Sequence, residues 1–455
     1  MNILHLAHRI PYPPDKGDKL RAFRQIEHLA KRHRVTAAFF VDDPEDERHV
    51  AGLRAYCDRV VSIRIHKKWR MTRGMMRWLG GGTITEGFYD VAAMRRALAE
   101  LTPEIEFDAV LAFSSSMASF ALDIPAYRHV LDLCDLDSAK WYDYAGRARP
   151  PMRWIYRAEG TRLAKREQQW TATFDATVLI TRAEVEALRC EHAQRRIHVI
   201  TNGVTLPEPH ASACAIPPPE PHASACVVSQ PQERPDPAPT VGFVGQMDYV
   251  PNVDAVCFFA RESWPGIRRA VPDARFRIIG RCPTRVVRRL ESIDGIEVTG
   301  AVDDIHAQLR RIDVSVAPLR IARGLQNKVL EAMVAAKPVV LTPAAATGID
   351  ARDATEFVIA ADAPAFTDRV LELLADKNRR ERIGLAGQRF ATSNHDWVRE
   401  MTRLETILTE DAEPTAAPRI AVALRNVATS SSVPPTPQPS PKGRGSVFPL
   451  ASGGG

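Results

Sequence analysis

Residues 321–342 constrain the fold more than any other stretch of this sequence. Leu325, Val329, Met333 and Ala336 recur at intervals of four, four and three, the pattern of a helix with one buried face. The apolar run PVVLT follows at once and is typical of a short buried strand. A loop, an amphipathic helix and a buried strand in succession predict one unit of an α/β sheet.

Three residues of this segment suit a nucleotide sugar. Gly324 allows a ligand to approach the backbone closely, and the free N–H groups of the first helical turn favour a phosphate. Lys328 and Glu331 lie on one side of the helix, where they offer a cation to a diphosphate and a carboxylate to two ribose hydroxyls. A solvated pair of opposite charges would show the same spacing, so other parts of the chain must decide between the two interpretations.

The composition is that of an ordinary globular protein with two or three domains. The chain has 455 residues, of which 45% are hydrophobic and 25% charged. It has no apolar run of about 18 residues and no typical signal sequence at its N-terminus, so we expect a cytoplasmic protein. Seven cysteines without a CxxC pair predict free thiols and no zinc site. The net charge of +6 permits attraction to anionic lipid or phosphate-bearing substrates but does not predict a nucleic-acid partner.

Strand-like and helix-like segments alternate on both sides of a proline-rich region. We expect a first domain over 1–204 and a second over 241–395, followed by a helix over 396–410 that crosses back to the first domain. Between the domains, 205–240 holds ten prolines and the sequence PEPHASAC twice, which predicts a flexible linker. After the helix over 396–410, the segment 411–455 is rich in Pro, Ser, Thr and Gly, and we expect it to be disordered.

Two polar segments follow predicted strands of the first domain, where open α/β sheets bind their ligands. The loop HRIPYPPDKGDKLR contains Gly17 and Arg21. The segment HVLDLCDLDSAKW ends in a polar cluster that includes Asp135, Asp137 and Lys140. An Asp-x-Asp pair also occurs in metal-dependent enzymes, but it is common by chance, and we expect no metal here.

These motifs, taken in order, resemble glycosyltransferases with the GT-B fold, of the GT4 type. The resemblance rests on the Glu-Ala-Met helix followed by Pro-Val-Val and on the sequence VITNGV that closes the first domain. The first loop and the DLDSAKW block are similar to one subgroup, the sugar transferases associated with exosortase (XrtA) and PEP-CTERM systems. The resemblance implies two doubly wound Rossmann-like domains that face each other across a cleft.

The resemblance also implies roles for individual residues. Glu331 would bind the ribose, and Lys328 the diphosphate. Arg323 stands where the family usually has a second Glu, and Lys337 where it usually has a glycine at the helix end. Many members hold the diphosphate with Arg and Lys after the first strand of the second domain, but this chain has YVPN at 249–252, which shifts weight to Lys328 and Arg323. The remaining positions are Gly17 and Gly245 at the donor, Asp135 beside the sugar, and Arg21, Asp137 and Lys140 along the acceptor side of the cleft.

The implied activity is retaining transfer of a sugar from an NDP-sugar to a glycan or polyprenyl-linked acceptor, without a metal or other cofactor, in exopolysaccharide biosynthesis. Two other classes remain open. A GT-B protein that binds nucleotide sugars without turnover fits the presence of Arg323. A nucleotide-sugar epimerase of the same fold needs an acid and a base carboxylate in the cleft, and the aspartates from Asp132 to Asp137 offer them.

Residues 66–79 mix cations with bulky apolar side chains, as the sequence HKKWRMTRGMMRWL shows. Such a segment suits the headgroup region of an anionic membrane, where it would place the protein at the inner face of the cell membrane. An amphipathic helix packed with its apolar side on the domain would have the same composition. The sequence leaves both interpretations open.

Overall fold

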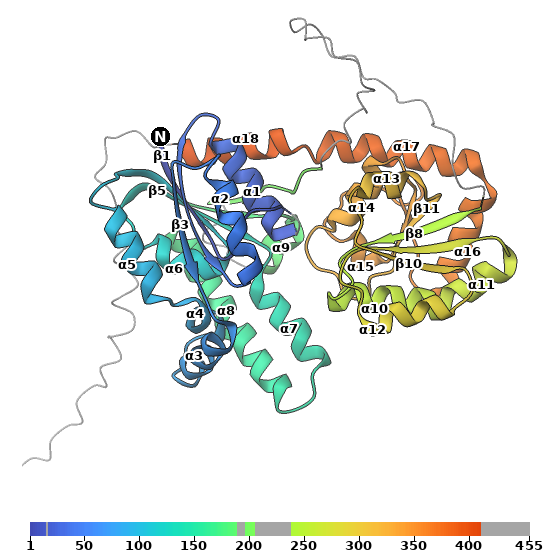
Figure 1. Ribbon diagram of the computed structural model, residues 1–455, viewed down its shortest axis with the longest axis horizontal. Helices are drawn as coiled ribbons and strands as arrows, with labels where there is room; N and C mark the ends of the chain where they lie inside the picture. Colours follow the sequence, from blue (N-terminus) through green and yellow to red (C-terminus); the bar gives the residue numbers. More distant parts are fainter. Residues whose placement is uncertain (15–16, 189–195, 205–237, 411–455) are drawn as a thin grey trace, which may run out of the picture. The chain divides into compact units, whose positions relative to one another are not determined.

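The computed structural model describes residues 1–14, 17–188, 196–204 and 238–410. Two parallel sheets follow one another along this part of the chain, each surrounded by helices (Figure 1). The α/β class with two Rossmann-like domains is therefore confirmed. Both sheets belong to one compact unit, Met1–Ile420.

The N-terminal domain contains a seven-stranded sheet with the strand order β3-β2-β1-β4-β5-β6-β7. Its strands are β1 Asn2–Ala7, β2 Arg34–Val41, β3 Arg59–Arg64, β4 Phe107–Phe113, β5 Ala126–Cys134, β6 Ala176–Leu179 and β7 Ile197–Val199. The central strands are buried along nearly their whole length. Helices cover both faces of a parallel sheet, which is why these strands appear in the sequence as continuous apolar runs.

The C-terminal domain contains a six-stranded sheet with the order β10-β9-β8-β11-β12-β13. Its strands are β8 Thr240–Val244, β9 Arg275–Ile279, β10 Ile296–Gly300, β11 Val314–Ala317, β12 Val339–Leu341 and β13 Val358–Ile359. Each sheet extends in two directions from its first strand, so the order reverses between β1 and β4 and between β8 and β11. In open α/β sheets, ligands usually bind outside the carboxyl ends of the strands at such a point.

The helices lie between the strands and at the C-terminal end of the described chain. Those of the N-terminal domain are α1 Gly17–Leu29, α2 Val50–Leu53, α3 Lys67–Leu79, α4 Ile84–Tyr89, α5 Ala92–Leu101, α6 Ala118–Ala121, α7 Asp137–Arg147, α8 Met152–Thr173 and α9 Arg182–Leu188. The later ones are α10 Val250–Phe258, α11 Trp264–Ala270, α12 Arg285–Arg288, α13 Ile305–Arg310, α14 Asn327–Val334, α15 Pro343–Ala346, α16 Ala363–Ala375, α17 Lys377–Asn394 and α18 Trp397–Thr409. None of the helices in the described ranges is both long and apolar enough to cross a membrane.

The final two helices belong to different cores. Ile383 of α17 lies in the C-terminal core, whereas Met401 and Leu404 of α18 lie in the N-terminal core. Asp396 separates the helices and caps α18, accepting hydrogen bonds from the backbone N–H groups of the first turn at 3.1 and 3.2 Å. Helix α18 therefore extends the first domain although it comes last in the described sequence.

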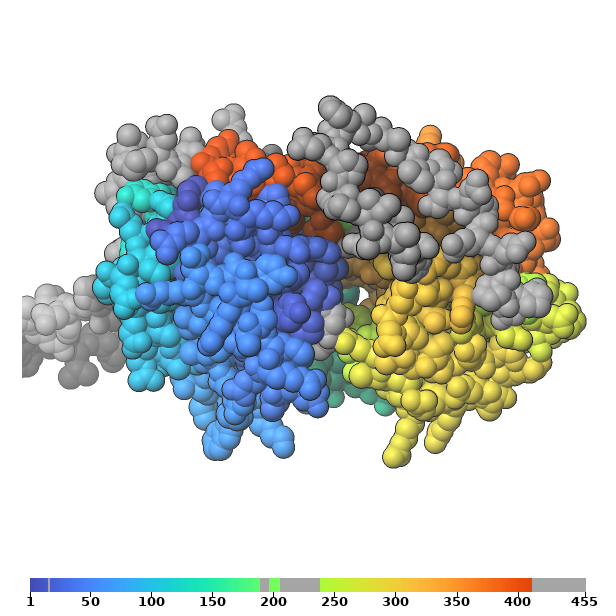
Figure 2. Space-filling model, turned by 45° about the horizontal axis from the view of Figure 1, so that its top comes forward, coloured from blue at the N-terminus to red at the C-terminus, as the bar shows by residue number. Residues whose placement is uncertain are grey.

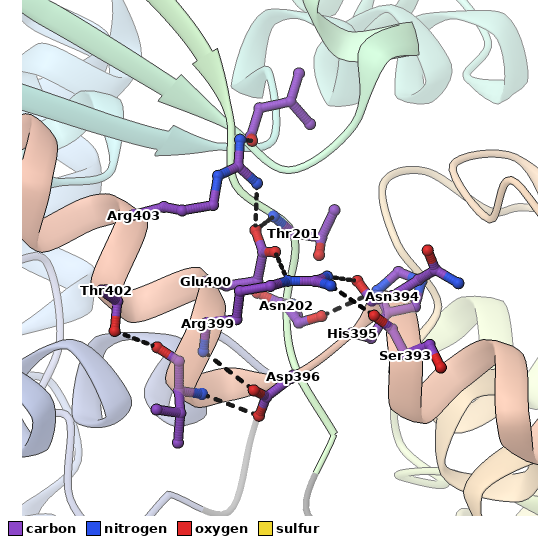
Figure 3. A network of polar contacts seen from close by, with 12 residues as sticks. Thr201, Asn202, Ser393, Asn394, His395, Asp396, Arg399, Glu400, Thr402 and Arg403 are labelled. Atoms are coloured by element: carbon purple, nitrogen blue, oxygen red, sulfur yellow. Dashed lines mark hydrogen bonds and ion pairs between the residues drawn. The ribbon is translucent and has the colours of Figure 1, made fainter.

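The chain passes between the domains twice, and the two crossings are bonded to each other (Figure 3). The His395 ring donates through Nδ1 to the Asn202 carbonyl at 3.2 Å, and the Val204 N–H donates to the His395 carbonyl at 2.8 Å. The buried Glu400 carboxylate accepts from the Thr201 N–H at 3.2 Å and is paired with arginines of its own helix. These contacts hold the start of α18 against the end of the N-terminal domain.

Glu405 connects α18 to α1, and its charge should make the stability of the fold depend on pH. Its carboxylate lies 2.7 Å from His28 Nε2 and 3.0 Å from His33 Nε2. Burial opposes ionisation of Glu405, but these hydrogen bonds keep its pKa below the usual value. A depressed carboxyl pKa stabilises the fold above the unfolded-state pKa, about 4.3, and this contribution disappears as the pH falls through the folded-state value. We expect Glu405→Gln to lower the free energy of unfolding by about 1–3 kcal/mol at pH 7, because the amide NH₂ meets an imidazole N–H.

Thermal unfolding of both proteins from pH 7 to pH 3 checks this expectation. The two curves should converge as the pH falls through the folded-state pKa of Glu405, where the wild-type carboxyl also becomes neutral. Glu291→Gln on the exposed surface is the control and should change stability by less than about 0.5 kcal/mol. A difference that stays constant over this pH range would contradict a role for the Glu405 charge.

Two predicted regions lie largely or wholly outside the described residues. These are the linker with its PEPHASAC duplication, which the structure describes only from residue 238, and the tail over 411–455. Their predicted flexibility therefore stays a prediction.

Candidate functional site

The loop after β11 and helix α14 occupy the switch point of the C-terminal sheet. The sequence pattern placed Leu325 in the helix, but α14 begins at Asn327, and Leu325 packs into the core from the preceding loop. At the other end the left-handed residue is Ala336, with φ of 54°, rather than Lys337. Alanine pays about 1 kcal/mol for this conformation, so the C-cap is weaker than a glycine would make it.

Lys328, in the first turn of α14, is positioned by residues of β8 and of the first turn of α10. Its Nζ donates a hydrogen bond to Asn252 Oδ1 and lies 5.2 Å from the centroid of the Phe243 ring. The Asn252 amide in turn donates to the Gln246 carbonyl at 2.9 Å. A Cβ at Gly245 would come within 2.7 Å of that amide nitrogen, so the loop needs glycine there. The loops after β8 and β11 thus build one cationic site.

The environment of Lys328 and Glu331 shifts the pKa of each toward neutrality. Both side chains are half-buried. Burial lowers the pKa of Lys328 to about 8, although the nearby Glu331 opposes the change. Burial likewise raises the pKa of Glu331 to about 7, against the effect of Lys328. Displaced pKa values in a crevice are a mark of functional sites, and ligand charges and hydroxyl groups would restore the solvation that these side chains lack.

Glu331 is available for a ligand. Within the described chain, its carboxylate forms no hydrogen bond or ion pair, and its interaction with Lys328 acts through space. The carboxylate can therefore accept hydrogen bonds from two neighbouring hydroxyl groups.

Gly324 lies directly against Asp135, which follows β5 in the N-terminal domain. The glycine has φ of 60°, and a Cβ there would come within 2.1 Å of Asp135 Oδ1. Glycine is therefore required both by the backbone conformation and by the close approach. Asp135 Oδ1 is buried and has no hydrogen-bond partner in the described part of the chain. An unpartnered buried carboxylate oxygen is rare and has a free capacity to accept a hydrogen bond.

Asp137 and Lys140 lie beside Asp135 at the start of α7. Lys140 Nζ is 3.0 Å from Asp137 Oδ1 and 3.7 Å from Asp135 Oδ2, and the Ser115 hydroxyl donates to Asp137 Oδ2 at 2.5 Å. Burial opposes both charges, but the contacts raise the pKa of Lys140 well above its ordinary value and lower that of Asp137. Ser115 comes from the loop after β4 and was not singled out in the sequence, where it is one of three consecutive serines.

Arg323 does not point to the predicted phosphate site. It forms a two-point ion pair with Asp143 of α7, with Nη2 at 2.9 Å from Oδ1. Its neighbour Arg320 pairs with Asp254 of α10. Of the two cations predicted to bind the donor diphosphate, Arg323 is therefore paired with a carboxylate, whereas Lys328 donates to the side-chain amide oxygen of Asn252.

A cavity of about 200 Å³ adjoins this ion pair. Its lining includes Asp143, Thr181, Glu184, Arg323 and Gly324. The volume is smaller than the roughly 300–1,000 Å³ of pockets that enclose a whole small ligand, so the cavity suits only part of a substrate.

Arg21 differs from its prediction because it lies beneath the cleft surface instead of on it. Its side chain is fully buried, and Nε donates to Asp132 Oδ2 at 2.8 Å. Nη1 donates to Asn202 Oδ1 at 3.0 Å, and the Asn202 amide donates to Asn327 Oδ1 at 3.1 Å. Arg21 is thus a positioning residue, linked through Asn202 to the first residue of α14.

Gly17 lies close to the same point. A Cβ on this residue would be 3.4 Å from the Asn327 side-chain nitrogen, an ordinary contact. The first loop therefore reaches the N-terminus of α14. Sequence reasoning missed Asn202 and Asn252, although both occur in stretches noted for other reasons.

Comparison with known proteins identifies the domain that carries Lys328 and Glu331. Residues 238–376 match the family described as glycosyl transferases group 1. No curated protein sequence matches the chain.

Solved structures with the same arrangement include sucrose-phosphate synthase from Thermosynechococcus elongatus, with 13% identity and a TM-score of 0.64 over 90% of this chain and 98% of that one. HepE from Anabaena, solved with UDP and glucose, has 13% identity and a TM-score of 0.59 over 90% and 99%. WaaG, a glycosyltransferase involved in lipopolysaccharide biosynthesis, has 14% identity and a TM-score of 0.57 over 90% and 100%. The chain therefore has the two-domain GT-B fold, and its residues 238–376 are similar to the glycosyl transferases group 1 family.

Proposed function

We propose that this protein is a retaining glycosyltransferase of the GT4 type that transfers a sugar from an NDP-sugar to a glycan or polyprenyl-linked acceptor. It needs no metal or other cofactor, and it acts in the cytoplasm at the inner face of the membrane, in exopolysaccharide biosynthesis. The likeness of the first loop and of the DLDSAKW block to the PEP-CTERM-associated subgroup supports the role in exopolysaccharide synthesis.

The observation that carries the proposal is the pair Lys328 and Glu331 at the switch point. Lys328 is the second residue of α14, so its positive charge adds to that of the helix N-terminus. The carboxylate lies one turn further along the same helix and has no protein partner in the described residues. A cation and a free carboxylate one helical turn apart suit a diphosphate joined to a ribose.

The same groups account for departure of the nucleotide. As the bond between the sugar and the diphosphate breaks, negative charge grows on the leaving oxygen, and Lys328 with the N–H groups of α14 stabilises that charge. In retaining enzymes of this fold the leaving phosphate is itself held to take the acceptor proton, so no protein base is needed. Asp135 would orient the sugar through its unpartnered oxygen. Arg323 would add a second cation once it leaves Asp143.

The acceptor is assigned to the N-terminal side of this crevice. Asp137 and Ser115 offer hydrogen-bonding groups there, and Lys140 balances the carboxylates. Arg21 supports this surface from below. Asp132 is fully buried in its ion pair with Arg21. It is therefore not one of the two acid–base carboxylates that an epimerase would need in the cleft.

A donor screen followed by a transfer assay tests the function. Purified protein is mixed with UDP-, GDP-, ADP- and TDP-sugars, with UDP-sugars first because HepE was solved with UDP, UDP-glucose, and UDP with glucose. A true donor at 100 times its dissociation constant should add about 2.7 kcal/mol of stability. With that donor and a membrane lipid extract, labelled sugar should move to the acceptor. Tight binding without transfer would instead support a non-catalytic protein, and an epimerised donor would support the epimerase.

A further inference from the structure

Helix α3 turns several of its large apolar side chains away from the protein. Trp69 is 78% exposed, Met76 66% and Leu79 74%. Trp69 and Met76 are seven residues apart and share one face of the helix. The inner face holds Arg70, whose guanidinium donates to three backbone carbonyls of the α4 region, among them Phe88 at 2.5 Å. Gly74 is also buried against α4, and Met75 and Trp78 are half-buried, so α3 is packed on its domain while Trp69, Met76 and Leu79 stay exposed.

Three of the five cations of α3 are exposed and have no carboxylate partner among the described residues. Lys68, Arg73 and Arg77 are exposed, and no described carboxylate pairs with any of them. Lys67 alone pairs, with Asp42 at 3.0 Å. The exposed face therefore combines aromatic and aliphatic side chains with uncompensated positive charge.

The tip of the α7–α8 hairpin repeats this composition. Trp154 is 66% and Tyr144 52% exposed. Arg149, Arg153 and Arg157 are exposed, and none has a carboxylate partner among the described residues. The hairpin tip is a feature that the structure adds.

Helix α8 contacts the C-terminal end of α3 and the start of α4. Arg162 of α8 donates to the Trp78 carbonyl at 2.5 Å and to the Gly82 carbonyl at 3.0 Å, and its guanidinium stacks over the Trp78 ring at 4.9 Å. Glu159 accepts from the Ile84 N–H at 2.8 Å. Trp154 precedes Arg162 by eight residues, or about 12 Å of helix, so the hairpin tip stays close to the end of α3. Figure 1 shows both elements projecting from one side of the N-terminal domain, and in Figure 2 the blue segment around α3 again forms an outer edge.

We propose that α3 and the tip of the α7–α8 hairpin form a single surface that docks on an anionic lipid bilayer. Its aromatic and aliphatic side chains enter the headgroup region, and its lysines and arginines meet lipid phosphate. The pairing of apolar exposure with unpaired cations, and the absence of any acidic residue from α3, fits a lipid surface better than a protein partner. The conclusion that this docking presents the transfer site to a lipid-linked acceptor rests on the proposed function.

Vesicle sedimentation with the full chain tests the docking independently of turnover. Vesicles of equal parts phosphatidylglycerol and phosphatidylcholine should bind the protein, whereas phosphatidylcholine vesicles should not, and added salt should weaken the binding. Arg149→Gln/Arg153→Gln/Arg157→Gln should reduce partitioning by about a hundredfold, because each cation near an anionic surface contributes a factor of about five. Trp69→Ser/Met76→Ser should reduce it by at least about tenfold.

Control variants separate docking from general effects. Val398→Ser on α18 and Arg382→Gln on α17 remove an exposed apolar side chain and an exposed cation elsewhere, and both should bind vesicles as the wild type does. The docking variants should keep the wild-type melting temperature and donor affinity. Failure of sugar transfer with intact vesicle binding would leave the docking standing and overturn the proposed activity.

Several results would overturn the docking surface. Equal binding to neutral vesicles, or unchanged binding of both docking variants, would remove its basis. An oligomer that dissociates in Trp69→Ser/Met76→Ser, without vesicle binding by the wild type, would make this face a contact between copies of the chain. Loss of binding in the α3 variant alone would exclude the hairpin from the surface.

Discussion

Replacing Lys328 with methionine should lower kcat/KM for the donor by about 10²–10³, or roughly 3–4 kcal/mol of transition-state stabilisation. Methionine keeps an unbranched chain against the Phe243 ring but removes the ammonium group that would meet the leaving diphosphate. It also leaves Asn252 Oδ1 without the donor that it accepts from in the structure. The loss should fall mainly on kcat, because charge on the leaving oxygen is greatest in the transition state.

Initial rates of NDP release with saturating acceptor measure this effect. Glu331→Gln is the companion variant and should act mainly on KM, since contacts with the ribose change little between the ground state and the transition state. Lys377→Met, an exposed lysine at the start of α17, is the control and should leave both constants unchanged. Full activity in Lys328→Met with an unaltered fold would show that the diphosphate is bound elsewhere, and the proposed site would be lost with it.

The fold could be predicted from the sequence because its signals are local. The buried strands appear as apolar runs such as VTAAFFV and TVGFVG, and loops rich in glycine and proline separate them from the helices. Element ends were less certain, since a helix that starts at Asn327 and one that starts at Leu325 differ by less than a turn. Such boundaries depend on capping and tertiary packing that the hydrophobic pattern does not record.

The partners of the site residues could not be predicted, because they come from distant parts of the chain. Asn252 and Lys328 are 76 residues apart in the sequence, and they meet because β8 and β11 are neighbours in the sheet. Arg323 meets Asp143 across 180 residues. The sequence shows that an arginine is present, but not whether it is free for a phosphate or already paired with a carboxylate.

Arg21→Met should be the most destabilising of the changes considered, by about 3–5 kcal/mol. Arg21 and Asp132 are both fully buried, and their ion pair is 2.8 Å long. Methionine would leave the Asp132 carboxylate in the core with the Gln25 amide as its remaining side-chain donor. At about 2–4 °C per kcal/mol for a domain of this size, the N-terminal domain should melt about 10 °C lower.

A double-mutant cycle distinguishes a role of Arg21 in the buried ion pair from a role at the cleft surface. Arg21→Met/Asp132→Leu should be more stable than Arg21→Met, because the second change removes the uncompensated charge. Arg24→Met, on the same helix and paired with Glu27 at the surface, should cost less than about 1 kcal/mol. If Arg21→Met instead kept its melting temperature and lost only transfer, Arg21 would act at the cleft, as the sequence predicted. The large stability effect follows because a carboxylate sealed from water depends on its counter-charge far more than one that water can solvate.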